Sequence, residues 1–350
     1  MEIVQNASEL VRYMNSAFEA GGGRRVLIDK YFEGREVEVD AVCDGETVLI
    51  PGIMEHVERA GIHSGDSACI LPPQNLTSDV LRRLEEQGKI LARELRVKGL
   101  MNIQFAVKDD EIFLIEVNPR ASRTVPFVSK SIGHPLAKYA TWLMLGQKLS
   151  DIGFSYETPE SVSVKETVFP FISFSGADTE LGPEMKSTGE VMGRGENLED
   201  AFLKAQVAAY QSEIKEGHIF IGVTDQDKQG MVPAALEFQK AGRKILATEG
   251  TYKVLQKAGV TIIEKTSLDR EDPDNIFDYI DRKEVALIVN TTRPRKRSVD
   301  AKHIRRVALM KNLPYFTTVE GTMNIACAIV ATDSGKKLKY KSLLISSKNS

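Results

Sequence analysis

The sequence predicts a mixed α/β protein that contains two sheets of different kinds. Residues 101–117 read as two strands, MNIQFAV and EIFLIEV, joined by a polar turn at Lys108-Asp109-Asp110, which is typical of an antiparallel hairpin. From about residue 216 onward, apolar strands alternate with amphipathic helices, as in a parallel sheet that is covered on both faces. With 350 residues, the chain can form two domains with substantial cores.

The composition is that of a globular protein, with 42% apolar residues, 27% charged residues and a net charge of −3. This charge does not indicate nucleic-acid binding. Cys43, Cys69 and Cys327 are too few and too scattered for a disulfide framework or a zinc site, so we expect reduced thiols. No apolar run reaches membrane-spanning length, and the N-terminal stretch lacks the features of a signal peptide. We therefore expect a cytoplasmic protein without a membrane segment.

The first part of the chain shows helical and strand patterns in turn. Leu10, Val11, Met14 and Phe18 stand at helical spacing and predict an amphipathic helix within residues 2–19. We expect three further strands before the hairpin, at residues 26–32, 36–44 and 47–57. A helix that begins at Thr77 should follow them and cover residues 77–98, and a helix at 134–149 should follow the hairpin.

The second part is more regular. Residues 151–212 change character and hold one alternating strand at 163–171, so they are interpreted as a connector. After them we expect five strands, each followed by a helix. The strands begin at residues 218, 244, 261, 285 and 315. The predicted division is therefore 1–150, 151–212 and 213–350, and the last part should fold as a doubly wound parallel sheet.

The hairpin carries the strongest functional signal. Strict alternation places Leu114, Glu116 and Asn118 on one face, and Phe113, Ile115 and Val117 on the other. Gln104 on the neighbouring strand can approach the face of Glu116. Carboxylate and amide oxygens suit Mg²⁺ or Mn²⁺, which bridge phosphates, and Arg120 and Arg123 could bind phosphate or carboxylate oxygens. An ordinary hairpin with a solvated edge is the alternative, but the grouping favours a functional site.

Two other stretches could serve a nucleotide. The loop GIHSGDSACILPP offers His63 and Ser64 as donors, with Gly61 and Gly65 permitting close approach of the backbone. Glu36, Glu38 and Asp40 share one face of a predicted strand. These three acids are either solvated or line a cleft that receives a ribose hydroxyl or an ammonium group.

Polar residues also follow the predicted parallel strands, where ligands bind in such sheets. Hydroxyls, amides and a helix N-terminus predict an anion pocket built from Thr248 to Thr251, Lys265, Asn290, Thr291 and Thr292. Lys228 lies on the loop after the first strand and could join them. The basic run from Arg293 to Arg297 either adds charge nearby or forms a solvated loop.

The runs MNIQFAVKDDEIFLIEVNPRASRTVPFVSK, EHVERAGIHSGDSA and LGPEMKSTGEVMG closely resemble the large subunit of carbamoyl-phosphate synthase. The resemblance covers essentially the whole chain and concerns the C-terminal portion of that family. It implies the later part of the second ATP-grasp module, with an antiparallel sheet, followed by a regulatory domain with a methylglyoxal-synthase-like fold. It further implies that the chain is a fragment that lacks part of its active site.

The resemblance implies a ligase that uses ATP and Mg²⁺ or Mn²⁺ to phosphorylate carbamate to carbamoyl phosphate, in pyrimidine and arginine biosynthesis. A small glutaminase subunit would be the partner of the full enzyme. Arg120, Glu116 and Asn118 would be catalytic, and Gln104, Glu116 and Asn118 would hold the metal. The nucleotide would be bound by Lys30, Phe32, Glu36, Gly61, Ile62, His63, Ser64, Gln104 and Glu116.

Two effector sites are implied as well. A nucleotide effector such as UMP or IMP, or a phosphoribosyl compound, would be bound by Lys228, Thr248, Gly250, Thr251, Lys265, Asn290, Thr291 and Thr292. A second site, for ornithine in some members, would use Glu58, Asp66, Glu166, Tyr315 and Thr317.

Three other identities are conceivable for such a chain. A biotin-dependent carboxylase is disfavoured because no Met-Lys-Met biotinylation site is present, and a methylglyoxal synthase because its Gly-Gly-Asp is absent. An effector-binding module without catalysis stays open. Binding of UMP, compared with turnover of ATP, would separate that module from an enzyme.

Overall fold

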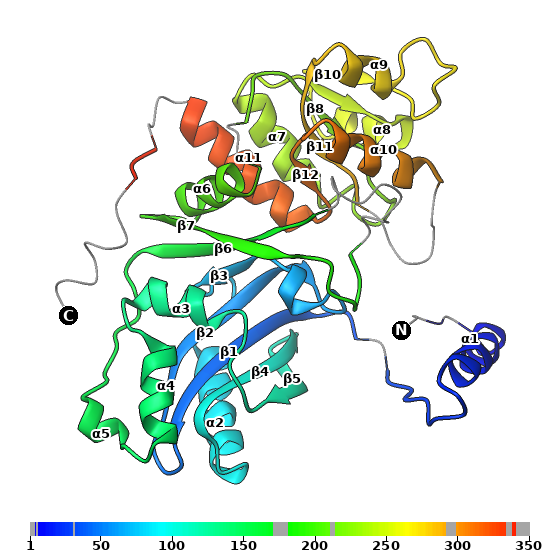
Figure 1. Cartoon of the computed structure of the whole chain (residues 1–350). Helices are drawn as coiled ribbons and strands as arrows, with labels where there is room; N and C mark the ends of the chain where they lie inside the picture. Colours follow the sequence, from blue (N-terminus) through cyan, green and yellow to red (C-terminus); the bar gives the residue numbers. More distant parts are fainter. Residues whose placement is uncertain are drawn as a thin grey trace.

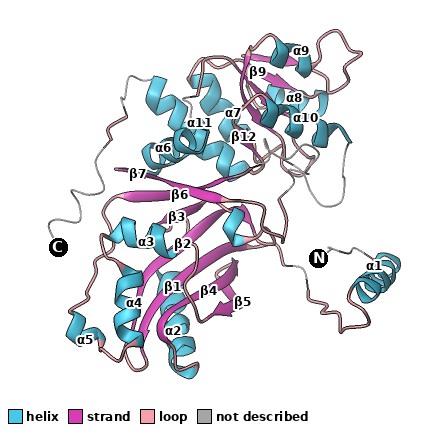
Figure 2. Ribbon diagram, in the orientation of Figure 1, coloured by secondary structure: helices cyan, strands magenta, loops and turns pink. Residues whose placement is uncertain are grey.

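The computed structural model of this chain describes residues 4, 6–30, 32–170, 181–210, 214–291, 299–333 and 338–340 (Figures 1 and 2). It contains one seven-stranded sheet and one five-stranded sheet, with helices packed against both. The first sheet is antiparallel throughout and the second is parallel throughout. The predicted mixed α/β class, with an antiparallel part followed by a parallel part, is confirmed.

The antiparallel sheet has the strand order β5-β4-β1-β2-β3-β6-β7. Its strands are β1 (Arg35–Asp44), β2 (Val48–Arg59), β3 (Cys69–Leu71), β4 (Lys98–Lys108), β5 (Glu111–Asn118), β6 (Val162–Val168) and β7 (Gly189–Gly195). The predicted hairpin corresponds to β4 and β5. Its turn residues Asp109 and Asp110 both have positive φ angles, as a two-residue turn with the twist of the sheet requires.

Helices cover both faces of the antiparallel sheet. Helix α2 (Ser78–Glu94) begins at Thr77, whose side chain accepts a hydrogen bond from the amide of Val80, as predicted. Val80, Leu84 and Ala92 of α2 pack against the apolar face of β1 and β4. On the other face lie α3 (Val125–Ile132), α4 (Leu136–Met144) and α5 (Leu149–Ile152). That second face carries polar residues where these helices do not cover it.

The parallel sheet has the strand order β10-β9-β8-β11-β12. Its strands are β8 (His218–Ile221), β9 (Ile245–Ala247), β10 (Ile263–Lys265), β11 (Val285–Val289) and β12 (Tyr315–Phe316). Its helices are α7 (Val232–Lys240), α8 (Glu249–Lys257), α9 (Ile276–Asp281), α10 (Val299–Met310) and α11 (Val319–Asp333).

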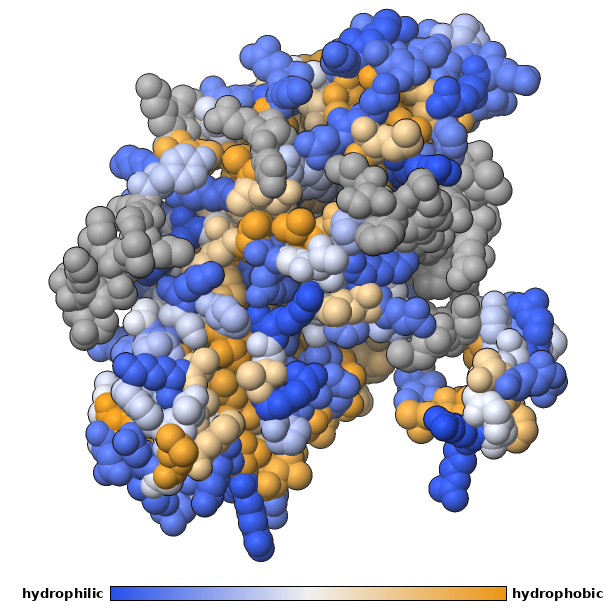
Figure 3. Space-filling view, viewed as in Figure 1, coloured by the Kyte–Doolittle hydropathy of each residue, from blue (hydrophilic) through white to orange (hydrophobic). Residues whose placement is uncertain are grey.

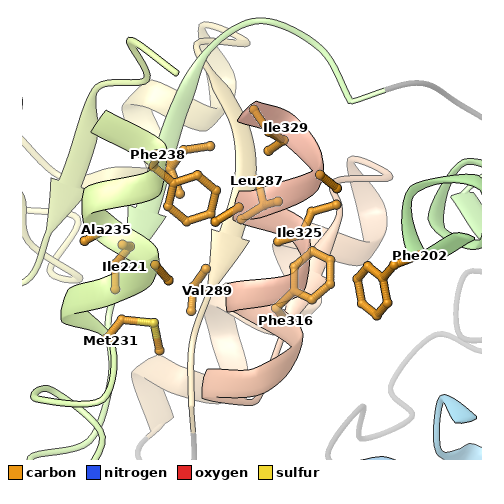
Figure 4. Close-up of a cluster of buried hydrophobic side chains, with 14 of the residues drawn as sticks. Phe202, Ile221, Met231, Ala235, Phe238, Leu287, Val289, Phe316, Ile325 and Ile329 are labelled. Atoms are coloured by element: carbon orange, nitrogen blue, oxygen red, sulfur yellow. The ribbon is translucent and has the colours of Figure 1, made fainter. Parts of the chain in front are cut away.

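Both faces of the parallel sheet are buried, as the apolar strands predict. Ile221, Leu287 and Val289 pack against α7 and α11 in one cluster (Figure 4). Phe220 and Ile288, which alternate with them, pack in a second cluster with residues of α9 and α10. Successive strand residues thus serve opposite sides of the sheet.

Residues 151–212, interpreted above as a connector, add β6, β7 and α6 (Leu198–Tyr210) to the fold. The sequence predicts one strand here, whereas the described residues of this segment form two. Phe202 of α6 belongs to the same buried cluster as Val164 of β6 and Ile219 of β8, so the two sheets share a core. Gly193 allows this packing, because a Cβ atom there would lie 2.0 Å from the carbonyl oxygen of Ala201.

The N-terminal segment differs from the rest of the chain. Helix α1 (Ala7–Ala20) is capped by Asn6, has no buried residue and stands apart from the other elements (Figure 1). Apolar side chains are visible on this separate part (Figure 3). The predicted strand at 26–32 is wrong: its described residues, 26–30 and 32, form no strand, and Leu27 is 84% exposed. A strand needs a hydrogen-bonding neighbour, and no described strand pairs with this stretch.

Two negative expectations can be compared with the described part of the chain. No helix within it has both the length and the apolar character needed to cross a membrane. All three cysteines are free, and Cys43 and Cys69 are buried in the antiparallel sheet.

Candidate functional site

A β-bulge in the hairpin decides which side chains of β5 meet. Gln104 pairs with Glu116, but the next residue of β4, Phe105, pairs with Leu114, so that Ile115 is the extra residue. Leu114 therefore shares the face of buried Phe105, and Phe113, opposite Ala106, shares the face of Gln104. The predicted grouping of Leu114 with Glu116 and of Phe113 with Val117 is wrong, because the bulge reverses the alternation.

The three candidate metal ligands lie together on the polar face of the hairpin. Gln104 and Glu116 are direct cross-strand partners, and Asn102 of β4 is the partner of Asn118. The side-chain amide of Asn118 donates to Glu116 Oε1 at 2.8 Å. The side-chain amide of Gln104 donates to Ser64 Oγ at 2.8 Å, which brings the loop after β2 to the same place.

The segment after β5 adds two arginines. Arg120 is exposed, its backbone amide donates to the carbonyl of Asn118, and its guanidinium donates to the carbonyl of Ala121 at 2.9 Å. Arg123 points elsewhere and donates to Ser187 Oγ at 3.0 Å, beside β7. The structure thus separates the two arginines: Arg120 stays beside Asn118, whereas Arg123 fastens the segment to the loop that precedes β7.

The loop between β2 and β3 is held by hydrogen bonds within itself and to neighbouring segments. Gly61 has a φ of +102°, which favours glycine. His63 Nδ1 accepts a hydrogen bond from the amide of Gly65, and the His63 amide donates to the carbonyl of Gly182. Ile62 forms an isolated bridge with Ala60. The loop therefore lies fixed beside Gln104, with Ser64 between them.

The other candidate nucleotide-binding residues differ in whether they lie beside the hairpin. The rings of Phe32 and Phe113 lie 4.3 Å apart, which places Phe32 on the polar side of the hairpin. Glu36 is buried opposite Ala106, and burial raises the pKa of its carboxyl. Lys30 is exposed on the segment without regular structure. Phe32 and Glu36 thus adjoin the hairpin, whereas Lys30 is not placed beside it.

The acids of β1 form a buried row rather than a solvated edge. Glu36, Glu38 and Asp40 are each no more than 3% exposed. His56 of β2 lies between two of them, with Nε2 3.2 Å from Glu38 and Nδ1 3.8 Å from Glu36. Of the two possibilities left open by the sequence, the structure excludes the solvated one.

Buried cations compensate part of this charge. Burial alone would lower the pKa of His56, but Cys69 and the two glutamates outweigh it and raise the pKa well above its usual value. Lys165 of β6, also buried, donates to the carbonyl of Ser67 at 2.8 Å, and its pKa is likewise raised against burial, by Cys69 and by acids. The network of Glu38, His56 and Lys165 therefore carries charges of both signs inside the sheet.

Glu38, His56 and Cys69 each offer a ligand atom, and these atoms lie within 4.8 Å of one another. His56 Nε2 and Glu38 already form a hydrogen-bonded ion pair, so the cluster is accounted for without an ion.

The candidate anion pocket lies at the carboxyl ends of β8, β9 and β11. The side-chain amine of Lys228 lies over Gly250 at the start of α8, 2.4 Å from where a Cβ would stand. Thr248 donates to Thr251 Oγ1 at 3.2 Å, and Thr291 Oγ1 accepts from the amide of Thr224. These residues are brought together as the topology predicts.

The remaining residues of the candidate anion pocket differ in their burial. Asn290 is buried and donates to the carbonyl of Gly222. Lys265 is exposed, 3.9 Å from Glu249 at the start of α8. Thr292 lies outside the described residues.

The second candidate effector group lies where the two sheets meet. Glu58 accepts from the amide of Ala68 and Glu166 accepts from Gln206, while Asp66 accepts from the amides of Lys186 and Ser187. Burial and the charge of Glu166 raise the pKa of Glu58 to about 8. Burial raises the pKa of Glu166 to about 6.

Tyr315 reaches this junction from β12. The amide of Tyr315 donates to Tyr210 Oη, and the hydroxyl of Tyr315 donates to the carbonyl of Asn290 at 3.0 Å. Burial and the charge of Glu166 raise the pKa of Tyr210. Thr317 is half-buried two residues further along the chain. Tyr315 thus adjoins both the second group and the anion pocket.

Sequence reasoning missed His56, Lys165 and Asn102. His56 and Lys165 stand on apolar strands where a polar residue faces inward, and this is the signal that could have found them. Asn102 alternates with Gln104 on β4 and donates to Glu38 at 2.6 Å and to Asp40 at 2.8 Å.

Two family models match this chain. One, described as the carbamoyl-phosphate synthase L chain, ATP binding domain, matches residues 1–152. The other, described as the MGS-like domain, matches residues 230–317.

Individual proteins match over nearly the whole chain. The carbamoyl phosphate synthase large chain of Methanobrevibacter smithii is 47% identical over 98% of this chain and 32% of its own length. That of Pasteurella multocida is 48% identical over 94% of this chain and 31% of its own. The carbamoyl phosphate synthase large chain, C-terminal section, of Methanocaldococcus jannaschii is 44% identical over 97% of this chain and 57% of its own.

The chain thus spans about a third of the full-length relatives named here and just over half of the C-terminal section. Among solved structures, a biotin carboxylase–β,γ-ATP complex from Campylobacter jejuni is 17% identical, over 61% of this chain and 54% of that one, with a TM-score of 0.48.

Proposed function

Because the chain belongs to the carbamoyl phosphate synthase large-chain family and corresponds to its C-terminal portion, we propose that residues 1–150 bind ATP and a divalent metal for the phosphorylation of carbamate. The product is carbamoyl phosphate, for pyrimidine and arginine biosynthesis. Residues 213–350 bind a phosphorylated effector that regulates this activity. In the full enzyme, a small glutaminase subunit supplies the ammonia.

The observation that carries the proposal is the meeting of Gln104, Glu116 and Asn118 on one face of the hairpin. The bulge at Ile115 supports it as well, since it turns Phe113 toward Phe32 on that face. An aromatic pair beside a carboxylate–amide group suits a nucleotide, whose base stacks while its phosphates bind a metal.

The donor set fits Mg²⁺ or Mn²⁺. Each of the three side chains supplies an oxygen, no sulfur or ring nitrogen is among them, and the group lies beside Ser64 and Arg120. Gln104, Glu116 and Asn118 would hold the metal, which supplies neutralisation of phosphate charge when bound.

Within this proposal each residue has a separate task. Ser64 and the backbone of Gly61 to His63 hold the nucleotide from the loop after β2, and Glu36 accepts a hydrogen bond from a ribose hydroxyl. The exposed guanidinium of Arg120 binds the phosphoryl group during transfer, when its charge spreads over three oxygens. These tasks position charged groups rather than form covalent intermediates.

The proposed effector site is the anion pocket of the parallel sheet. Lys228 over the N-terminus of α8, with the hydroxyls of Thr248 and Thr251, supports a phosphorylated ligand. A nucleoside monophosphate such as UMP is our choice, with IMP or a phosphoribosyl compound as the other candidates. Glu58, Asp66 and Glu166 would receive the ammonium group of an amino-acid effector such as ornithine.

The test uses Mn²⁺ as a paramagnetic probe in place of Mg²⁺. We expect the chain to bind Mn²⁺ in the presence of ADP, measured by electron paramagnetic resonance, and Glu116→Gln to weaken this binding at least tenfold. Glu111→Gln, at the far end of the same strand, is the matched control and should bind like the wild type. Equal binding by Glu116→Gln and the wild type would contradict the metal site.

A pure effector-binding module is the second candidate. The exposed segment that carries Lys30 favours it, because a nucleotide there would lack one set of contacts. Calorimetric binding of UMP, without any ADP-dependent Mn²⁺ binding, would favour the module. ADP-dependent Mn²⁺ binding without binding of UMP would favour the ATP-binding function.

A further inference from the structure

Asp40 holds the segment that carries Arg120. Its carboxylate accepts hydrogen bonds from Ser122 Oγ at 3.1 Å and Thr124 Oγ1 at 2.8 Å, although these residues lie more than eighty positions further along the chain. The oxygen atoms of the two hydroxyls lie 2.6 Å apart. Asp40 is fully buried, so water does not compete for these bonds.

The same carboxylate also fixes the start of the segment. Asp40 Oδ1 accepts from the side-chain amide of Asn102 at 2.8 Å, and Asn102 is the cross-strand partner of Asn118. Asp40 therefore anchors both sides of the short turn at Pro119, Arg120 and Ala121.

Arg120 itself has few other contacts. Its hydrogen bonds join it to Asn118 and Ala121, which flank it in the same turn. The position of its guanidinium is therefore set by the position of the turn, and the turn is set by what anchors it.

We propose that Asp40 is a positioning residue, which aims the Arg120 guanidinium at the phosphoryl group beside Glu116. This inference rests on the function proposed above for Arg120. Asp40 does not touch the ligand and acts only through Ser122, Thr124 and Asn102.

The cost of keeping an acid at this position supports a functional role. Burial, and then the charge of Glu38, raise the pKa of Asp40 to about 7, against the hydrogen bonds from Asn102, Thr124 and Ser122. Above pH 7 the folded protein must hold a buried negative charge that the unfolded chain keeps in water. A residue that served stability alone would be better as an uncharged amide, whereas a firm acceptor for three donors requires the carboxylate.

The experiment compares Asp40→Asn, Arg120→Ala and the double variant in the full chain. Inorganic phosphate, titrated in the presence of Mn²⁺ and ADP, is the probe of the guanidinium site. We expect Asp40→Asn to weaken phosphate binding about tenfold while Mn²⁺–ADP binding stays within twofold. The double variant should be no weaker than Arg120→Ala, because Asp40 acts through Arg120.

Two further measurements separate positioning from stability. Amide hydrogen exchange at 120–124 should become about tenfold faster in Asp40→Asn, and the urea midpoint at pH 8 should stay equal or rise. Asp44→Asn is the matched control, because Asp44 is a buried acid of the same strand that binds the amides of Glu46, Thr47 and Leu149. It should leave phosphate binding unchanged.

The outcomes distinguish an error in the role of Asp40 from an error in the proposed function. If Arg120→Ala loses phosphate and Asp40→Asn does not, the positioning role is wrong and the proposed function stands. If the wild type binds Mn²⁺–ADP but its phosphate affinity is unaffected by Arg120→Ala, the role of Arg120 is wrong, and the inference with it. A urea midpoint that falls in Asp40→Asn, together with equal weakening of every ligand, would show a merely structural residue.

Discussion

The two sheets of this protein place their polar groups in opposite ways. The antiparallel sheet buries Glu36, Glu38, Asp40, His56 and Lys165 on one of its faces. In the parallel sheet, the buried residues of β8, β9 and β11 are apolar on both faces, and most of the polar candidate residues follow the carboxyl ends of the strands. An antiparallel strand can devote every second residue to a site, whereas a parallel strand between two layers of helices cannot.

The difference has consequences for how each site is held. Residues of the antiparallel site come from strands and are fixed by cross-strand pairs such as Gln104 with Glu116. Most residues of the proposed effector site come from loops and helix ends, such as Lys228 and Gly250, which depend on the packing beneath them.

The largest effect is expected from the core that the two sheets share. Phe238→Ala should lower the free energy of unfolding by about 3–5 kcal/mol, because Phe238 is fully buried in that cluster. Urea unfolding followed by circular dichroism would measure it. Phe113→Ala, at a half-exposed ring on β5, is the control and should cost less than about 1 kcal/mol. Separate unfolding transitions for the two sheets would argue against a shared core.

The next effect concerns pH and should come from the antiparallel side. The folded-state pKa values of Glu58 and Glu166 are raised to about 8 and about 6, so the folded protein binds more protons than the unfolded chain above pH 4.5. Stability should therefore fall as the pH rises from 5 to 8, and the raised pKa of buried Asp40 adds to this fall. Glu58→Gln should flatten this dependence in urea titrations at several pH values.

Asp227, at the carboxyl edge of the parallel sheet, behaves in the opposite sense. Burial opposes its ionisation, but hydrogen bonds from Arg59, Thr291 and Thr224 lower its pKa to about 2. Its contribution to stability is present above pH 3.8 and is lost only as the pH falls toward 2. If the pH dependence of stability between pH 5 and 8 persisted in Glu58→Gln and disappeared in Asp227→Asn, its assignment to the antiparallel sheet would be wrong.

A smaller effect is expected in the anion pocket. Thr251→Ala and Lys265→Ala should each weaken UMP binding about tenfold, which is about 1.4 kcal/mol, since each removes one partner of a phosphate or ribose. Calorimetry on the full chain would measure this. Thr141→Ala and Lys257→Ala are the controls, on α4 and in the last turn of α8. Loss of UMP binding in a control variant would point to a general effect on the fold.

The smallest effect concerns the ion pair that joins the two parts. Arg59 Nη2 lies 2.7 Å from Asp227 Oδ1, and the Arg59 side chain is 43% exposed. Exposed pairs are screened by water, so a double-mutant cycle with Arg59→Gln and Asp227→Asn should give a coupling of no more than about 1 kcal/mol. A larger value would mean that this contact, rather than the shared core, holds the two sheets together.

Much of the fold could be predicted because it is written in local patterns. The alternation of β1, the apolar run of β8 and the helical pattern of α2 are local features of the sequence, and the two kinds of sheet could be predicted from such patterns. The strand expected at 26–32 failed because its apolar residues have no neighbouring strand. The site group of Gln104, Glu116 and Asn118 could be named, since these residues lie on one hairpin.

The sequence by itself therefore determined the class of each sheet and the polar character of the hairpin, because the order of strand and helix patterns and the residue types within them are local features of the chain. The bulge at Ile115, the burial of the acids of β1 and the bonds of Asp40 to Ser122 and Thr124 were decided by the tertiary structure. They depend on which strand pairs with which residue, and on segments far apart in the chain that meet only when the sheet has formed.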